Sequence, residues 1–217
     1  MKINSTIKWY NDNARSFKFA VEKFVFKNDL DQLEQFSKLV KANGKILDVG
    51  SGSGRDTVLF FKRGFDVVGM DLSKNLIKLS KESNSKIKFI QGSMLKIPFP
   101  DKYFDGLWVH ASMLHISKMS DVVKAMSEFN RVCKSNGTLH VFVRAKMGRL
   151  KKEYLQRSDS KGKRLFRYFS QQELKTLLFD SGFELLSMEQ YPESKNNPNG
   201  RSEIDWIVVL AKKIINL

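Results

Sequence analysis

The chain has 217 residues, of which 41% are hydrophobic and 28% are charged, and this composition excludes a disordered or fibrous protein. Its single cysteine, Cys133, excludes an internal disulfide framework, and no apolar run approaches the roughly 20 residues that a membrane-spanning helix needs. Lysine and arginine outnumber aspartate and glutamate by 38 to 23, so the net charge of +15 would attract anions such as nucleic acid, unless the lysines only solvate the surface.

These features predict one domain over residues 1–217, with an N-terminal helical cap over 1–43 and a core over 44–217. The N-terminus lacks the apolar segment of a secretory signal, and a lone cysteine suits a reducing compartment, so we expect a cytoplasmic protein. Basic residues are densest between 144 and 167, where ten lysines and arginines stand against two acids. We interpret the stretch near 144–169 as a basic insertion in the core.

The order of patterns along the chain predicts the fold class. The first forty residues show the periodicity of two amphipathic helices, with apolar contacts from Phe17, Phe19, Phe24, Phe26 and the stretch 30–36. Expected strands cover 45–49, 66–70, 86–90, 104–110, 138–143, 183–189 and 203–211. Expected helices cover 55–62, 72–80, 118–133 and 171–180, with N-caps at Ser73 and Ser170. This alternation predicts an α/β fold, with a parallel sheet covered on both faces and ligands bound at the carboxyl ends of its strands, under the N-terminal helices.

The most informative segment, 46–56, lies where the first strand gives way to a helix. Its glycines let the backbone turn sharply and approach a ligand closely. A phosphate-binding P-loop would end in Gly-Lys-Ser/Thr, but Gly54 is followed by Arg55 and Asp56. A dinucleotide fingerprint needs a small third residue, and Arg55 stands there instead. We expect Asp56 to cap the helix.

The remaining pattern, apolar-x-Asp-x-Gly-x-Gly-x-Gly beginning at Ile46, resembles motif I of the class I S-adenosylmethionine (SAM)-dependent methyltransferases. The resemblance implies a Rossmann-like, doubly wound, seven-stranded sheet, mostly parallel with an antiparallel last strand and helices on both faces. It implies SAM as cofactor and S-adenosylhomocysteine as product, with Asp48 near the amino-acid end. Asp71, 21 residues after Gly50, stands where the family has an acid for the ribose hydroxyls. The alternative for Asp71 is a charge that stabilises the next helix.

Further segments carry the same resemblance. The stretch 104–116 resembles the fourth-strand motif of the type 11/25 methyltransferases, and 131–139 resembles their turn before strand five. Many relatives have an adenine-binding acid where this chain has Ser93, so we expect a hydroxyl or backbone contact at Ser93 and Met94, with Met94 packing on the adenine, in its place. The predicted cofactor-binding residues are Asp48, Gly50, Ser51, Gly52, Gly54, Arg55, Asp71, Leu72, Ser93, Met94, His110 and Tyr10.

The methyl acceptor is less strongly indicated, because a sulfonium methyl is already activated and needs mainly an aligned acceptor. The predicted catalytic residues are His110, His115 and Tyr10, each with a structural role as the alternative. Further acceptor-side candidates are Arg15, Arg167, Tyr168, Arg201 and Trp206. No metal site is predicted, because the three histidines lack the spacing of metal ligands.

Three functions remain open. The first is methylation of a small molecule at N, O or S. The second is methylation of tRNA at a wobble uridine, which the basic charge would favour. The third is a SAM-binding regulator without catalysis. We expect a small-molecule acceptor or tRNA as partner, no membrane, and a monomer or homodimer.

Overall fold

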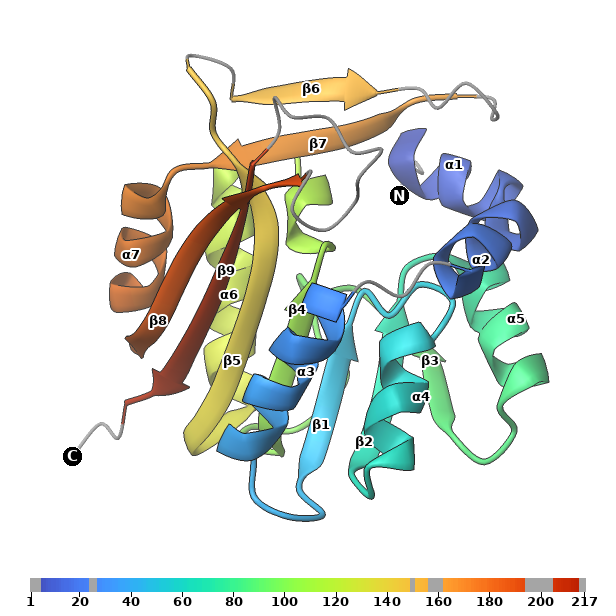
Figure 1. The fold of residues 1–217 in the computed structure, drawn as a ribbon, viewed down its shortest axis with the longest axis horizontal. Helices are drawn as coiled ribbons and strands as arrows, with labels where there is room; N and C mark the ends of the chain where they lie inside the picture. Colours follow the sequence, from blue (N-terminus) through green and yellow to red (C-terminus); the bar gives the residue numbers. More distant parts are fainter. Residues whose placement is uncertain (1–4, 24–26, 149–150, 156–161, 194–204, 215–217) are drawn as a thin grey trace.

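The computed structural model describes residues 5–23, 27–148, 151–155, 162–193 and 205–214. Its centre is a twisted sheet whose strands β3, β2, β1, β4 and β5 pair in that order and run parallel. β9 pairs antiparallel with β5, and β8 pairs antiparallel with β9 (Figure 1). The strands are β1 (Lys45–Val49), β2 (Asp66–Asp71), β3 (Lys88–Gln91), β4 (Phe104–His110), β5 (Cys133–Ala145), β8 (Phe183–Pro192) and β9 (Asp205–Lys213).

The predicted fold class is confirmed, and the predicted strand number is wrong by two. A hairpin of β6 (Lys152–Leu155) and β7 (Arg164–Phe169) occupies the stretch interpreted as a basic insertion. β7 joins β5 through two residue pairs only, Arg144 with Tyr168 and Ala145 with Phe169. β9 pairs along one edge of β5. β7 therefore pairs with the opposite edge, which β5 also shares with β4, and lies beyond the end of β4. Closely spaced lysines and arginines obscured the buried apolar residues of β7 in the sequence.

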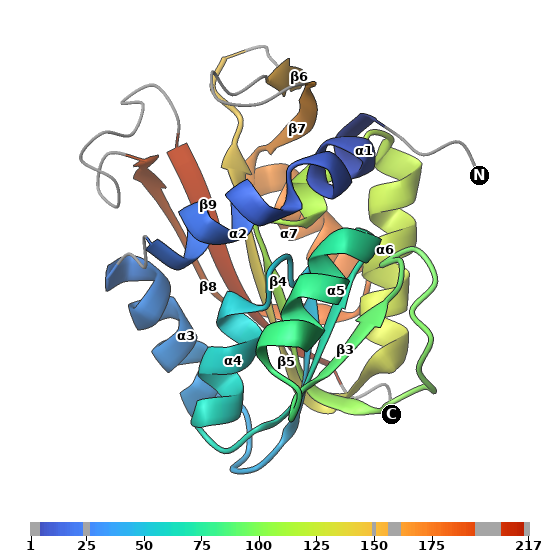
Figure 2. The same cartoon turned by 90° about the vertical axis from the view of Figure 1, so that its right-hand side faces the viewer.

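Helices cover both faces of the sheet because the side chains of each strand alternate between the faces. On one face, Ile46, Val67 and Trp108 pack against α3 (Lys27–Leu39) and α4 (Arg55–Lys62), with α5 (Lys74–Ser83) beside them. On the other face, Leu47, Val68 and Leu107 pack against α6 (Met119–Val132) and α7 (Gln171–Asp180). Figures 1 and 2 show these two helical layers with the sheet between them.

Both predicted N-caps are confirmed. The Ser73 side chain accepts a hydrogen bond from the backbone N–H of Leu76 at the start of α5. Ser170 accepts from the N–H of Glu173, and the Glu173 carboxylate accepts from the N–H of Ser170, which completes a capping box on α7. These caps fix where the chain turns from strand to helix on opposite sides of the sheet.

The described residues of the N-terminal segment form three helices instead of the expected two: α1 (Ser5–Asp12), α2 (Ala14–Lys23) and α3. α1 and α2 contact α5 near the carboxyl edge of the sheet. α3 instead lies along the sheet, where Phe36 is fully buried against Phe60 and Trp108. Phe19 is 70% exposed and packs on nothing in the core, and Phe24 and Phe26 lie outside the described residues. No helix within the described ranges is long and apolar enough to span a membrane.

Candidate cofactor and acceptor pocket

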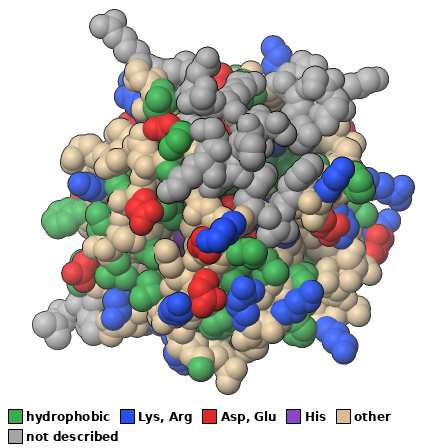
Figure 3. All heavy atoms as spheres, viewed as in Figure 1, with side chains coloured by type: hydrophobic (Ala, Val, Ile, Leu, Met, Phe, Trp, Pro, Cys, Tyr) green, Lys and Arg blue, Asp and Glu red, His purple; other side chains and the backbone are tan. Residues whose placement is uncertain are grey.

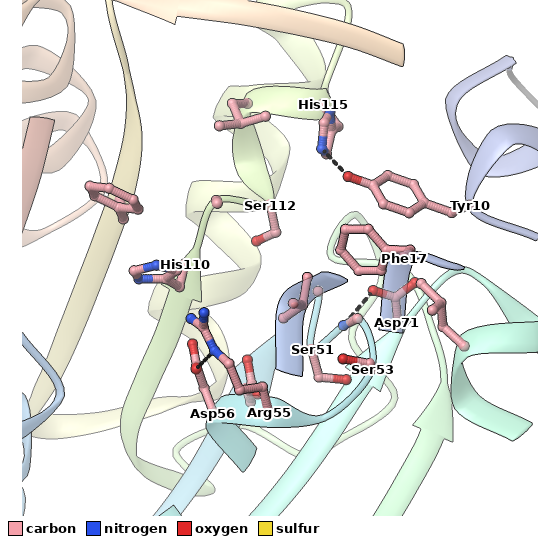
Figure 4. Close-up of a pocket in the computed structure, with 18 of the residues that line it drawn as sticks. Tyr10, Phe17, Ser51, Ser53, Arg55, Asp56, Asp71, His110, Ser112 and His115 are labelled. Atoms are coloured by element: carbon pink, nitrogen blue, oxygen red, sulfur yellow. Dashed lines mark hydrogen bonds and ion pairs between the residues drawn. The ribbon is translucent and has the colours of Figure 1, made fainter. Parts of the chain in front are cut away.

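A pocket of about 420 Å³ opens at the carboxyl ends of β1, β2 and β4, where side chains of α1 and α2 close it (Figure 4). Gly54, Leu72, Ser93 and Met94 do not line it. The Ser93 hydroxyl instead accepts a bond from the N–H of Leu95 and so stabilises a turn. The predicted residues that line the pocket are Tyr10, Asp48, Gly50, Ser51, Gly52, Arg55, Asp71, His110 and His115.

The loop after β1 needs glycine at the positions where the sequence has it. Gly50 has φ +77°, and a Cβ there would lie 2.3 Å from Cβ of Ser112. Gly54 has φ +85°, and a Cβ there would meet the Phe89 ring at 2.8 Å, so Gly54 serves the turn and the packing beneath the pocket. The loop backbone therefore forms the floor of the pocket, with no side chain at Gly50 or Gly52 to fill it.

Asp71 lies at the end of β2 beside this loop. Its Oδ2 accepts from the N–H of Gly52 at 3.0 Å, and its Oδ1 accepts from the N–H of Ser73 at 2.7 Å. Burial raises the pKa of Asp71, and the backbone hydrogen bonds oppose that shift. A carboxylate offers about four acceptor sites, so Asp71 retains capacity for the two hydroxyls of a ribose.

Two hydroxyl groups at the same end of the pocket lack internal partners. The Oγ atoms of Ser51 and Ser53 are buried and make no hydrogen bond within the described residues, although both residues line the pocket. Buried polar atoms without a partner are costly, and a polar ligand can satisfy them. The bare glycine loop, the two hydroxyls and Asp71 together fit the nucleoside part of SAM.

A group of charged side chains lies beside the loop, and it includes one acid, Asp29, that was not among the predicted site residues. Arg55 Nε donates to Asp56 at 2.7 Å, and Arg55 Nη1 is 3.2 Å from Asp29 of α3. Asp56 also accepts from the indole N–H of Trp108 at 2.9 Å. The expected helix cap by Asp56 is therefore wrong, because its oxygens bind Arg55 and Trp108, and α4 has no side-chain cap.

The acids of this group differ in their tendency to ionise. Burial opposes ionisation of Asp56, but Arg55 outweighs it and lowers the pKa of Asp56 to about 2. Burial and the nearby Asp56 raise the pKa of Asp48 to about 8, although the Thr57 hydroxyl donates to Asp48 at 2.6 Å. Asp48 is therefore largely protonated at neutral pH until a cation approaches it.

His110 stands at the end of β4 between aromatic rings. Its ring stacks on Trp108, with centroids 5.2 Å apart, and on Phe142, with centroids 4.4 Å apart. His110 Nε2 is 3.7 Å from Asp29, and Nδ1 is 3.3 Å from Nε2 of His140. Burial lowers the pKa of His110, so the ring is a neutral, fixed wall of the pocket at pH 7.

Tyr10 and His115 meet across the pocket, as Figure 4 shows. His115 Nδ1 is 2.6 Å from the carbonyl oxygen of Leu165, which can only accept, so Nδ1 carries the proton of the neutral ring. His115 Nε2 therefore accepts from the Tyr10 hydroxyl at 2.8 Å. Arg164 Nη1 donates to the same Tyr10 oxygen at 3.2 Å. Burial lowers the pKa of His115 to about 3, and burial raises the pKa of Tyr10 against the opposing effect of Arg164.

Sequence reasoning also missed the residues of β5 and β7 that face the pocket. Phe142 and Arg144 line it from β5, and Arg164 and Phe166 line it from β7. Residues two apart in a strand lie on the same face of the sheet. An aromatic residue and an arginine two positions apart in each strand were therefore the sequence signal for a shared inward face. Recognising that alternation required assigning residues 164–169 to a strand.

Of the other predicted acceptor residues, only some line the pocket. Trp206 lines the pocket, and Arg201 lies outside the described residues. Arg15 is exposed on α2 and does not line the pocket. Arg167 points away from the pocket, because its guanidinium donates to the carbonyls of Ile116 and Ser117. Tyr168 also lies outside the lining, and its hydroxyl donates to Glu153.

Comparison with known proteins relates this pocket to one family. Residues 47–141 match the family model described as a methyltransferase domain. Demethylmenaquinone methyltransferase of Renibacterium salmoninarum is 32% identical over 97 residues, which cover 45% of this chain and 40% of that protein. The chain spans about two fifths of the length of the curated relatives it matches.

Two solved structures share the fold at low sequence identity. A SAM-dependent methyltransferase from Methanosarcina mazei aligns with a TM-score of 0.75 at 18% identity, covering 83% of this chain and 97% of that chain. The 1,6-didemethyltoxoflavin-N1-methyltransferase of Burkholderia thailandensis, solved with 1,6-didemethyltoxoflavin and S-adenosylhomocysteine, aligns with a TM-score of 0.65 at 18% identity. It covers 99% of this chain and 92% of that chain. Residues 47–141 therefore match a methyltransferase domain, and the fold that surrounds them is the one found in these structures of SAM-dependent methyltransferases.

Proposed function

We propose that this protein transfers the methyl group of SAM to an N, O or S atom of a small-molecule acceptor. The observation that supports the proposal is that the two ends of one pocket carry different groups. At one end lie Asp71 and the partnerless hydroxyls of Ser51 and Ser53. At the other lie Tyr10 and His115, held in a defined hydrogen-bonded arrangement.

The cofactor supplies a methyl group on a sulfonium, which is activated without any help from the protein. Asp71 would accept bonds from the ribose hydroxyls, and Asp48 would face the ammonium group. With these groups held, the protein's main contribution is to orient the acceptor and exclude water. In this proposal the bare loop over Gly50–Gly52 lets the backbone approach the cofactor closely.

The Tyr10 hydroxyl is the proposed contact to the acceptor. When the acceptor atom bonds to the methyl carbon and the carbon–sulfur bond breaks, any proton on that atom must leave. The Tyr10 oxygen can accept it while passing its own proton to Nε2 of His115. Because the pKa of His115 is lowered to about 3, this route suits an acceptor that becomes strongly acidic as it reacts.

The tRNA alternative loses part of its support. Three of the basic residues in 144–167 are directed inward: Arg144 and Arg167 are buried, and Arg164 lines the pocket. Among the described side chains on the face that Figure 3 displays, lysines and arginines are interspersed with acids and apolar side chains and do not form one basic patch. We therefore favour a small molecule over a nucleic acid.

The test of the donor site is calorimetric titration with SAM. Asp71→Ala should weaken SAM binding by at least about tenfold, since two charge-assisted hydrogen bonds are lost. Asp66→Ala is the matched control, because Asp66 begins the same strand at its other end and its carboxylate pairs with the partly exposed Lys45. Equal SAM affinity in the wild type and Asp71→Ala contradicts the assignment. A labelled-SAM screen of metabolites and bulk tRNA then separates an enzyme from a regulator that binds SAM without transferring its methyl group.

A further inference from the structure

Two arginines line the end of the pocket that the cofactor's nucleoside does not need. Arg144 projects from β5 and Arg164 from β7, and both are among the pocket residues. Arg144 is only 8% exposed, and Arg164 is partly buried. An arginine removed from water is costly unless a negative or polar group compensates it. The partners of each arginine therefore show whether the pocket still lacks a negative group for it.

Arg144 and Arg167 are compensated within the fold. Arg144 Nη1 is 3.8 Å from the Glu153 carboxylate and 3.5 Å from the Tyr168 hydroxyl. Arg167 donates to two backbone carbonyls. Neither guanidinium needs a ligand for its charge, although Arg144 still adds positive potential to the pocket.

Arg164 differs from both. Within the described residues it has no carboxylate in ion-pair distance, and its one hydrogen bond goes from Nη1 to the Tyr10 oxygen. Its Nε is buried and lacks a hydrogen-bond partner. Aromatic faces supply the rest of its surroundings, with its guanidinium carbon 4.2 Å from the Trp9 centroid and 5.1 Å from that of Phe166. Rings can hold a cation in place, but they leave its hydrogen-bond donors unused.

The walls around these arginines are flat and apolar. Phe142 stacks on Trp206 with centroids 4.5 Å apart and planes 14° apart, and the Phe166 ring lies 4.2 Å from the Arg144 guanidinium. Such walls favour a planar, unsaturated ligand. Glu193 also lines the pocket, but no ion pair joins it to Arg164.

From the unused donors of Arg164 and these aromatic walls, we propose that the methyl acceptor is a small aromatic carboxylate whose carboxylate group binds Arg164. Arg144 adds electrostatic attraction, and the ring of the acceptor packs beside Phe142, Phe166 and Trp206. The Tyr10 hydroxyl, which Arg164 already contacts, then lies next to the bound acid. The inference rests on the proposed function, because it names the substrate class of the same pocket.

The test measures binding in the presence of S-adenosylhomocysteine, which occupies the donor site without reacting. Protein saturated with S-adenosylhomocysteine is titrated by calorimetry with benzoate, 4-hydroxybenzoate, 4-aminobenzoate and indole-3-acetate, and with the amide of each. At least one acid should bind, with its amide at least about tenfold weaker, which is the usual effect of losing a charge-assisted hydrogen bond. Arg164→Gln should reduce the preference for that acid to less than about threefold, and Arg164→Lys should keep a preference.

Lys163→Gln is the matched control, because Lys163 precedes β7, is exposed and does not line the pocket. It should leave the acid preference unchanged. The proposal is overturned if no acid binds the saturated protein, if the amides bind as well as the acids, or if Arg164→Gln retains the preference. Failure to bind S-adenosylhomocysteine or SAM contradicts the proposed function instead, and titration of the acids without S-adenosylhomocysteine then still tests Arg164.

Discussion

Asp48 carries its proton at neutral pH, since burial and Asp56 raise its pKa to about 8. A cationic ligand group favours the ionised form of Asp48 and so displaces that proton on binding. Below pH 8 each unit of increasing pH makes the ionised form more abundant, by at most about tenfold. The affinity for SAM should therefore rise between pH 6 and pH 8, as measured by calorimetry at pH 6, 7 and 8. Asp48→Asn should flatten this dependence, and a flat wild-type profile would show that Asp48 does not face the ammonium group.

Tyr10 shares its hydroxyl with His115 and Arg164. Tyr10→Phe keeps the ring and its edge contacts with Trp9 and Phe17, and removes only that oxygen. Once an acceptor is identified, we expect kcat to fall by about tenfold to hundredfold, because proton acceptance is lost. SAM affinity should change by less than about threefold. Tyr154→Phe, at an exposed tyrosine of β6, is the control. A large loss of SAM affinity in Tyr10→Phe would instead assign the hydroxyl to the cofactor's carboxylate.

At the scale of elements, α3 packs on the sheet through Leu33 and Phe36, of which Phe36 is the larger. Phe36 is fully buried, 5.6 Å from the Phe60 centroid and 5.2 Å from that of Trp108. Phe36→Ala should lower the free energy of unfolding by about 3–5 kcal/mol, because it leaves a cavity between helix and sheet. Phe19→Ala removes a ring that is 70% exposed and should change the free energy of unfolding by less than about 0.5 kcal/mol. Denaturant unfolding of both variants checks the difference, and equal losses would mean that α3 is not docked through Phe36.

The proposed cofactor end of the pocket could be predicted from the sequence, because local rules determine it. Gly50 follows a buried strand directly, Asp71 ends the next one, and parallel strands bring these residues to one edge of the sheet. Both caps, Ser73 and Ser170, are likewise local signals. Each of these features depends on residues close together in the chain.

The proposed acceptor end depends on contacts between distant segments, which no local pattern specifies. Asp29 reaches Arg55 only because α3 packs on the sheet instead of over its edge. Arg164 reaches Tyr10 across 154 positions of sequence, through a hairpin that was interpreted as a basic insertion. High local charge concealed the period of two in β7, so its inward-facing residues were not recognised.

For the whole molecule, the net charge of +15 predicts that tRNA binds, whereas the inward arginines predict that tRNA is not the methyl acceptor. Bulk tRNA should bind at about 50 mM salt and be released at about 200 mM, as expected for contacts to phosphates alone. It should accept no methyl group from labelled SAM. Filter binding and scintillation counting check both statements. Methylated tRNA, or binding that survives 200 mM salt, would favour a nucleic-acid acceptor.

The narrow attachment of β7 has a consequence for how such a protein diversifies. Two residue pairs join the hairpin to β5, yet the hairpin supplies Arg164, Phe166 and the Leu165 carbonyl that sets the His115 tautomer. If the proposed function holds, substitutions at Arg164 and Phe166 would change which acceptor binds, with less effect on the proposed donor residues of the glycine loop and β2.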